Sequence, residues 1–243
     1  MTDKNSLQNV FIEKKAKQNY VREMFDAIAY RYDFLNHLLS FGLDFYWRWF
    51  AIRKLDLKGG EKIIDIACGT GDFSIMASKR NPSMIFGVDV SLNMLKIFRQ
   101  KAMKKGIKKI HLVCASAENL PFKSEVFDVC LVAFGVRNFS DLETGLREIH
   151  RVLKNGGKIA VLEFSMPKQP FKLFYLFYFR RILPFIGKLF SKHENAYTYL
   201  PESVLRFPEG EEFAKILNNC GFKRIEIHRL TFGIVTLYIG VKN

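Results

Sequence analysis

Residues 63–74, Ile-Ile-Asp-Ile-Ala-Cys-Gly-Thr-Gly-Asp-Phe-Ser, decide how this chain of 243 residues folds. An apolar run passes into a turn that carries Gly69 and Gly71, and an acidic residue stands at each end of the turn. Glycines at this spacing let the backbone approach a ligand closely and leave helix N-terminal amides facing it. The stretch therefore predicts a strand, a tight turn and a helix around a nucleotide-type site.

The turn departs from the dinucleotide-binding fingerprint at its third glycine, where Ser74 stands. Asp65 and Asp72 would repel a pyrophosphate, but they suit a ligand with positive charge, such as the ammonium and sulfonium groups of S-adenosylmethionine (SAM). A second apolar run, residues 84–90, contains Asp89, which is placed to accept hydrogen bonds from both ribose hydroxyls. By themselves, two glycines at this spacing are equally consistent with a simple tight turn. The SAM assignment therefore depends on the strands and helices that follow.

Strand and helix patterns alternate from residue 63 to residue 164. The expected strands are 63–67, 85–90, 110–114, 129–134 and 158–164, and the expected helices are 73–79, 92–105 and 141–154, the last ended by Gly156 and Gly157. A helix over 208–220 and two antiparallel strands, 225–230 and 234–241, close the chain after an interruption. This order predicts an α/β, doubly wound, seven-stranded sheet, mostly parallel with an antiparallel closing strand, as is typical of Rossmann-like class I SAM-dependent methyltransferases.

The chain is expected to form a single domain with four parts. Residues 1–55 form a helical cap, broken near residues 40–42, that packs on or over the edge of the sheet. Residues 56–165 are the cofactor-binding half, 166–206 an aromatic and basic insertion after the fifth strand, and 207–243 the closing helix and hairpin. The first residues contain no apolar signal core or anchor, so a cytoplasmic protein is expected.

The net charge of +14 is concentrated in two stretches that hold no acid, 96–109 and 168–192. Such stretches attract nucleic acid or an anionic lipid surface. A solvated lysine face explains the first stretch. The second is interleaved with aromatic residues, and it is too charged, and too soon broken by Pro184, to span a bilayer. It is expected to cover a hydrophobic substrate or to contact an anionic membrane at its inner face; a merely buried insertion is the alternative.

The four cysteines, Cys68, Cys114, Cys130 and Cys220, are widely spaced. They form no C-x-x-C pair and stand beside no histidine cluster that could hold zinc. Buried thiols and the absence of a metal are therefore expected.

Four short motifs outside the glycine turn carry a family resemblance. They are YDFLNHLLSFG (32–42) with Trp47 after it, FGVRN (134–138), RVLKNGG (151–157) leading to LEFS (162–165), and YTYLPES (197–203) before Phe207 and Pro208. Over about residues 21–242 the chain resembles the ubiquinone/menaquinone biosynthesis C-methyltransferases. It departs from their usual pattern at Leu35, Asp44 and Asn155, where the family usually has methionine, histidine and proline. Asp44 reverses the chemistry at its position.

The resemblance implies methyl transfer from SAM to a ring carbon of a polyprenylated quinol. The product would be menaquinol, from demethylmenaquinol, or the corresponding ubiquinone intermediate. A ring carbon is a poor nucleophile until the adjacent hydroxyl loses its proton, so the enzyme needs a group that accepts or stabilises that charge. The sulfonium supplies the electrophile, so this chemistry requires neither a metal nor a covalent nucleophile.

The resemblance also suggests which residues form the site. The expected cofactor set is Gly69, Thr70, Gly71, Asp89, Ser116 and Ala117. The glycine turn would hold the methionine part, the acid the ribose, and the last two residues the adenine. Ala133 stands where relatives contact the cofactor and offers only its backbone.

On the substrate side, Arg137 is the expected group that steadies a phenolate; a surface or capping arginine is the alternative. The other candidates are Tyr32, Asp33, Asn36, His37 and Asn138. His37 or Asp33 could relay a proton, and capping or packing roles are equally open for both.

Two other function classes stay open. The charge favours a nucleic-acid methyltransferase, but residues 133–136 are Ala-Phe-Gly-Val where base-amine methyltransferases carry an Asn- or Asp-Pro-Pro-aromatic tetrad, so no nucleic acid is expected as partner. A cofactor-binding but non-enzymatic partner of a quinone-pathway complex is disfavoured by the intact turn. The expected partners are a lipophilic quinol and, through residues 168–192, an anionic membrane; a homodimer is left open.

Overall fold

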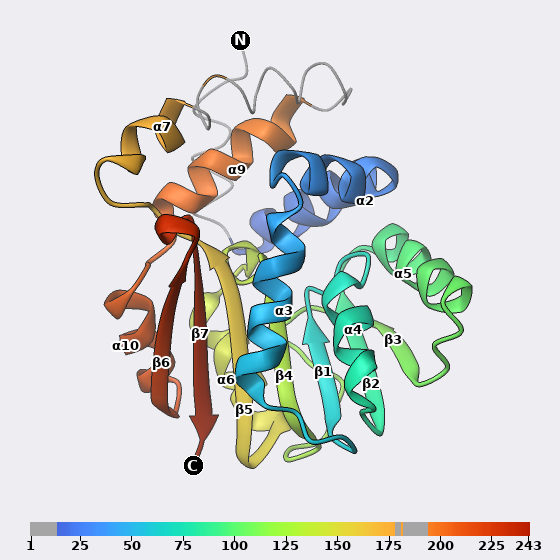
Figure 1. Ribbon diagram of the computed structural model, residues 1–243. Coiled ribbons are helices and arrows are strands. Elements are labelled where there is room, and N and C mark those ends of the chain that lie inside the picture. The colour runs from blue at the N-terminus through green and yellow to red at the C-terminus, as the bar shows by residue number, and fades with distance from the viewer. Residues whose placement is uncertain (1–13, 178–180, 182–193) are drawn as a thin grey trace.

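A computed structural model describes residues 14–177, 181 and 194–243, and a seven-stranded sheet lies at its centre (Figure 1). The strands are β1 (Lys62–Ile66), β2 (Met84–Asp89), β3 (Ile110–Cys114), β4 (Phe127–Ala133), β5 (Leu153–Phe164), β6 (Phe222–Leu230) and β7 (Val235–Lys242). Their order is β3-β2-β1-β4-β5-β7-β6, and β7 runs antiparallel to both its neighbours whereas the other pairs are parallel. The predicted sheet with its antiparallel closing strand is confirmed.

Among the described residues, helices cover both faces of this sheet and the end at which its parallel strands finish (Figure 1). They are α2 (Lys14–Leu39), α3 (Leu43–Leu55), α4 (Asp72–Ala77), α5 (Leu92–Lys104), α6 (Leu142–Val152), α7 (Phe171–Phe177), α9 (Glu194–Arg206) and α10 (Glu211–Asn219). Successive strand residues point to opposite faces, so Ile63 packs in the cluster that contains Trp47 of α3, and Ile64 in the cluster that contains Leu146 of α6. The strand order reverses between β1 and β4, where ligands bind in folds of this kind.

The N-terminal helices break where the sequence predicts, but they do not form one cap. The chain turns between α2 and α3 at Gly42, whose φ is +74°. Helix α3 then lies across the face of the sheet, because Trp47, Ala51 and Leu55 give it an apolar stripe that is buried against this face, with its main contacts to β5 and β7. The expected packing at the sheet's edge is therefore wrong for α3, whereas α2 covers the carboxyl ends of the strands (Figure 1).

The helix before β5 ends earlier than expected. Helix α6 stops at Val152 because Leu153 is fully buried and pairs with Phe127 of β4. The register then shifts before Lys158, and Gly156, with a φ of +78°, takes part in the irregular stretch between the two pairings. The two glycines thus accommodate a strand irregularity rather than a helix end.

The insertion contains a helix that the sequence pattern did not predict, α9, with Pro201 inside it. Of the aromatic and basic stretch 168–192, residues 168–177 and Arg181 are described, and the expectation for the remainder lies outside the described residues. No described helix is both long and apolar enough to cross a membrane. Cys114 is exposed at the end of β3, which corrects the expectation that all four thiols are buried.

Candidate active site

The glycine turn lies between β1 and α4, at the point where the strand order reverses. Gly69 and Gly71 have φ of +52° and +86°, values that L side chains rarely adopt. A Cβ atom on Gly71 would lie 2.1 Å from the ring of Phe98, which packs under the turn from α5. A side chain at this position would displace either the turn or α5.

Asp65 explains why serine replaces the third glycine. Its buried carboxylate accepts hydrogen bonds from the Ser74 backbone N–H at 3.1 Å and from the Ser74 hydroxyl at 2.7 Å. The acid therefore ties β1 to the first turn of α4, and it does not face a cationic ligand as the sequence reasoning assumed. Burial raises the pKa of Asp65 to about 7.

This buried acid predicts how stability depends on pH. Because the pKa of Asp65 is raised from 3.8 to about 7, the folded chain binds more protons than the unfolded chain between these values. The contribution of Asp65 to the free energy of unfolding is therefore fully present below about pH 4 and is lost as the pH rises to about 7. Asp65→Asn, which keeps an oxygen for Ser74, is expected to reduce the fall. Urea unfolding of the wild type and of Asp65→Asn at about pH 5 and about pH 7.5 measures the free energy of unfolding. If both proteins lose the same free energy between these pH values, Asp65 does not cause the fall.

A first cavity, of about 660 Å³ of empty space that is partly open to solvent, lies beside the turn. Gly69, Asp89 and Ala117 of the expected cofactor set line it, and so does Ala133. Asp89 accepts hydrogen bonds from the backbone N–H groups of Gly69 at 2.8 Å and Ser91 at 2.9 Å. Its carboxylate thereby joins the glycine turn to the end of β2, and burial raises its pKa to about 6.

The other three expected cofactor residues do not line this cavity. The hydroxyl of Thr70 donates to Asp33, Gly71 packs on Phe98, and Ser116 stands between two residues that do line it. The sequence reasoning missed Gln18, Val21, Phe25, Val90, Met94, Glu118 and Ser140. Val90 follows Asp89 directly and could have been included, whereas the residues of α2 reach the cavity through tertiary packing that no local motif indicates.

Helix α2 is fastened over the first cavity by polar contacts. Asp26 accepts hydrogen bonds from the Ser91 hydroxyl at 2.6 Å and from the Asn93 backbone N–H at 3.2 Å. Lys17 donates to the carbonyl oxygens of Arg137 and Phe139, and burial lowers its pKa to about 8. The helix therefore holds a fixed position above the ends of β1, β2 and β4.

A second, larger cavity, of about 1560 Å³ of empty space that is partly open, adjoins the first. It is mainly apolar and is lined by residues of α2, α3, α7 and α9, by the end of β5, and by the connections that follow α2, β4 and β6. Phe25, Tyr32 and Phe134 line both cavities. These three side chains therefore lie where the two cavities adjoin.

Arg137 lines the second cavity and is almost completely buried. Its Nη1 lies 2.8 Å from Glu163 Oε1 and also donates to the Phe134 carbonyl, while its Nε donates to the Ser203 hydroxyl at 3.2 Å. The alternative of a surface arginine is therefore wrong. Asn138, expected on the substrate side, lines the first cavity and accepts a hydrogen bond from Tyr199.

The remaining substrate-side candidates divide into two groups. Tyr32 and Asn36 line the second cavity, whereas Asp33 and His37 do not. His37 Nδ1 lies 2.9 Å from Asp44 Oδ2, and Nε2 lies 3.6 Å from Asp72.

Asp33, His37 and Asp72 come close enough together to resemble a metal site. The ammonium group of Lys101, however, forms ion pairs with Asp33 and with Asp72. The chain thus supplies its own cation between these carboxylates.

Comparison with known proteins agrees with this geometry. The model of the ubiE/COQ5 methyltransferase family matches residues 13–242. The chain belongs to this family. A ubiquinone/menaquinone biosynthesis C-methyltransferase UbiE from Geotalea daltonii is 45% identical over 230 residues, which cover 93% of this chain and 97% of that protein. A demethylmenaquinone methyltransferase from Bacteroides fragilis is 43% identical over 232 residues, 94% of each chain. The expected enzyme class, a methyltransferase with SAM as methyl donor, is confirmed.

Solved structures share the fold at low sequence identity. A SAM-dependent methyltransferase from Aquifex aeolicus has a TM-score of 0.60 at 18% identity and covers 81% of this chain and 89% of its own. The [4+2]-cyclase SpnF has a TM-score of 0.66 at 17% identity, and the match covers 91% of this chain and 94% of SpnF. Because one of these two proteins is named as a methyltransferase and the other as a cyclase, the fold alone does not define the reaction.

Proposed function

We propose that the chain transfers a methyl group from SAM to a ring carbon of a polyprenylated quinol, converting demethylmenaquinol to menaquinol or methylating the corresponding ubiquinone precursor. The observation that carries the proposal is the pair of adjoining cavities, one beside the glycine turn and one apolar, which share Phe25, Tyr32 and Phe134. The names of the relatives from Geotalea daltonii and Bacteroides fragilis support the choice of acceptor.

The first cavity suits SAM by the chemistry of its lining. The backbone at Gly69 and Ala133 allows close approach, and the Asp89 carboxylate lies at the end of β2, where an acid can accept from ribose hydroxyls. Ala117 offers a small apolar surface to the adenine. Bound SAM supplies an electrophilic methyl group.

The second cavity suits the quinol. Its apolar walls favour a polyprenylated ring and exclude water, and the buried Arg137 can stabilise the negative charge that develops when the ring hydroxyl loses its proton. Burial raises the pKa of Tyr32, so this phenol stays protonated and can donate a hydrogen bond. Asp44, which lines the cavity, contacts His37, and this pair offers a path for the released proton toward Asp72.

An acceptor competition tests the proposal. The protein is incubated with SAM labelled in its methyl group and with either reduced demethylmenaquinone in detergent or total RNA. Label is expected in the quinol extract. Label in RNA alone would refute the quinol as substrate and would favour the nucleic-acid alternative.

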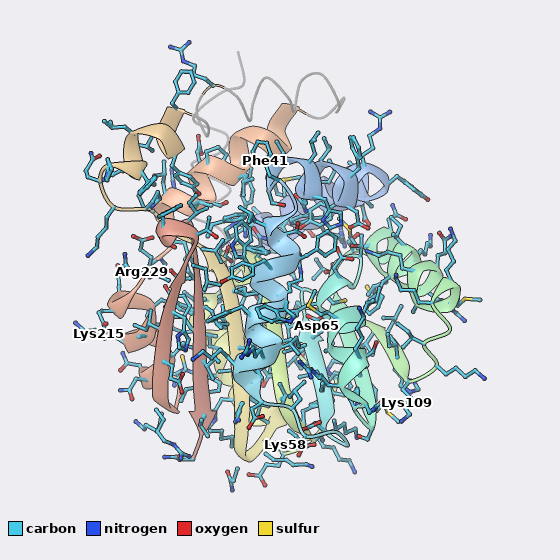
Figure 2. The ribbon with its side chains drawn as sticks, in the orientation of Figure 1. Phe41, Lys58, Asp65, Lys109, Lys215 and Arg229 are labelled. Atoms are coloured by element: carbon cyan, nitrogen blue, oxygen red, sulfur yellow. The ribbon has the colours of Figure 1, made fainter. Side chains whose placement is uncertain are left out.

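Exposed apolar side chains at the mouth of the second cavity, Phe41, Phe171, Leu173 and Phe232, form a rim that supports contact with a membrane. Phe41, Leu173 and Phe232 are 81%, 66% and 68% exposed, and the rings of Phe171 and Phe232 stack at 4.1 Å. Phe41 and Phe171 also line the cavity, and Figure 2 shows Phe41 at the end of the molecule where α2 and α9 lie. A quinol with a prenyl tail could enter from the lipid through this rim.

If the rim contacts lipid, removing one of its exposed aromatic side chains should weaken binding to liposomes. Phe41→Ser is expected to weaken binding to anionic liposomes about ten- to hundredfold, because a buried phenyl ring contributes about 1.5–3 kcal/mol. Co-sedimentation with vesicles measures the change. Met103→Ser, at a residue of α5 that is 71% exposed, is the control. Equal binding by both variants would count against the rim as the contact.

A further inference from the structure

A second buried arginine, Arg48, lines the second cavity, and one of its N–H donors lacks a hydrogen-bond partner among the described residues. The residue is 9% exposed and belongs to α3. Its Nη1 donates to the Asp44 carbonyl at 3.0 Å and to Asp44 Oδ2 at 2.6 Å. Its Nε is buried and has no hydrogen-bond partner among the described residues. Buried N–H groups nearly always have one, so an acceptor from outside the described residues, a water or a ligand atom, is expected at this donor.

Asp44 holds Arg48 in place. Besides the guanidinium, the Asp44 carboxylate contacts the Ser40 hydroxyl at 2.7 Å and His37 Nδ1 at 2.9 Å. Three contacts fix the carboxylate, and the carboxylate in turn fixes one side of the guanidinium. The remaining donors of Arg48 are therefore presented in one orientation, which is what a binding group needs.

Arg48 and Arg137 flank the same pair of aromatic rings. The Cζ atom of Arg48 lies 5.4 Å from the centre of the Phe134 ring, and that of Arg137 lies 5.6 Å from the centre of the Phe164 ring. The two rings are 4.6 Å apart. One apolar cavity thus contains two fixed guanidinium groups, one held by Asp44 and the other by Glu163.

We propose that Arg48 is a substrate-binding residue that donates to the second oxygen of the acceptor ring, and that Asp44 is its positioning residue. This inference rests on the proposed function, because a quinol carries oxygens on opposite sides of its ring. Arg137 faces the oxygen that loses its proton, and Arg48 binds the other. The site therefore selects diols over phenols that have a single oxygen, since a phenol leaves the Arg48 donor unpaired.

A substrate and variant cycle tests this assignment. Wild type and Arg48→Met are each assayed with a short-chain reduced demethylmenaquinone and with the analogue that lacks the hydroxyl farther from the methylated carbon. For the diol, Arg48→Met is expected to lower kcat/KM about ten- to hundredfold, mainly through KM, as for a lost hydrogen bond to a charged group. For the analogue, the variant and the wild type should be equal. Differences in ring reactivity cancel in this comparison.

Matched variants separate binding from structural damage. Arg53→Met removes the same charge from the same helix at a residue outside the cavity, so it should leave both acceptors unaffected. Arg48→Lys should recover part of the loss for the diol. If Arg48→Met fails to fold, Asp44→Asn with Arg48→Met removes both buried charges together and is compared with Asp44→Asn alone, so that the loss of Asp44 itself cancels.

The outcomes are distinct. An equal loss for both acceptors, or no loss for either, would overturn the role of Arg48 while leaving quinol methylation intact. If wild type methylates neither acceptor although calorimetry shows that it binds SAM, the proposed function itself fails, and the assignment of Arg48 fails with it.

Discussion

Arg137→Met is expected to lower kcat for quinol methylation by about a hundred- to a thousandfold, as for the loss of a donor that stabilises developing negative charge. SAM affinity should not change, because Arg137 lines the second cavity and not the first. Steady-state kinetics with the reduced quinol and calorimetry with SAM measure the two effects.

The same substitution leaves the buried Glu163 carboxylate without its ion-pair partner. We expect this to cost about 3–5 kcal/mol of stability, so the control must separate folding from chemistry. Arg137→Met combined with Glu163→Gln removes both charges and should recover stability without recovering kcat. If the double variant also recovers methyl transfer, Arg137 does not act on the substrate.

Gly71→Ala should destabilise the fold and abolish SAM binding. The added Cβ atom would lie 2.1 Å from the ring of Phe98, and φ at this position is +86°. Overpacking of this kind costs about 1–3 kcal/mol, in addition to about 1–2 kcal/mol for a left-handed residue with a side chain. Urea unfolding and calorimetry with SAM measure the two losses.

Gly106 provides the matched control. Its φ is +66°, and a Cβ atom there would meet no atom within 4 Å. Gly106→Ala should therefore show the backbone cost alone and should keep SAM binding. If Gly71→Ala is no more destabilising than Gly106→Ala, the packing of Phe98 under the turn does not shape the site.

Local sequence patterns predict the central sheet because each strand and turn has its own signal. Residues 63–74 combine an apolar run with two glycines, and the end of β2 is marked by Asp89. The position of α3 could not be predicted in this way, since Trp47 and Leu55 are buried by strands that come later in the chain. Helix α9 was missed because Pro201 is a signal against a helix interior.

The residues of the two cavities also divide into those that a local motif predicts and those that only packing across the fold brings into place. Gly69 and Asp89 were predicted from a turn and a strand end and Ala117 from the family resemblance, and all three line the first cavity. Contacts made across the fold were not predictable: Asp65 turns inward to Ser74, and Arg48 meets the cavity only because α3 packs on the sheet. The sequence therefore predicted the residues around the first cavity, proposed for SAM, better than those around the second cavity, proposed for the quinol.

The most direct test of the account is the position of the transferred methyl group. The protein is incubated with SAM deuterated in its methyl group and with reduced demethylmenaquinone, and the product is analysed by mass spectrometry and NMR. The account predicts a deuterated methyl group on the ring carbon, with loss of the ring proton at that carbon. A methyl ether on the quinol oxygen, or no transfer to the quinol by protein that binds SAM, would contradict it.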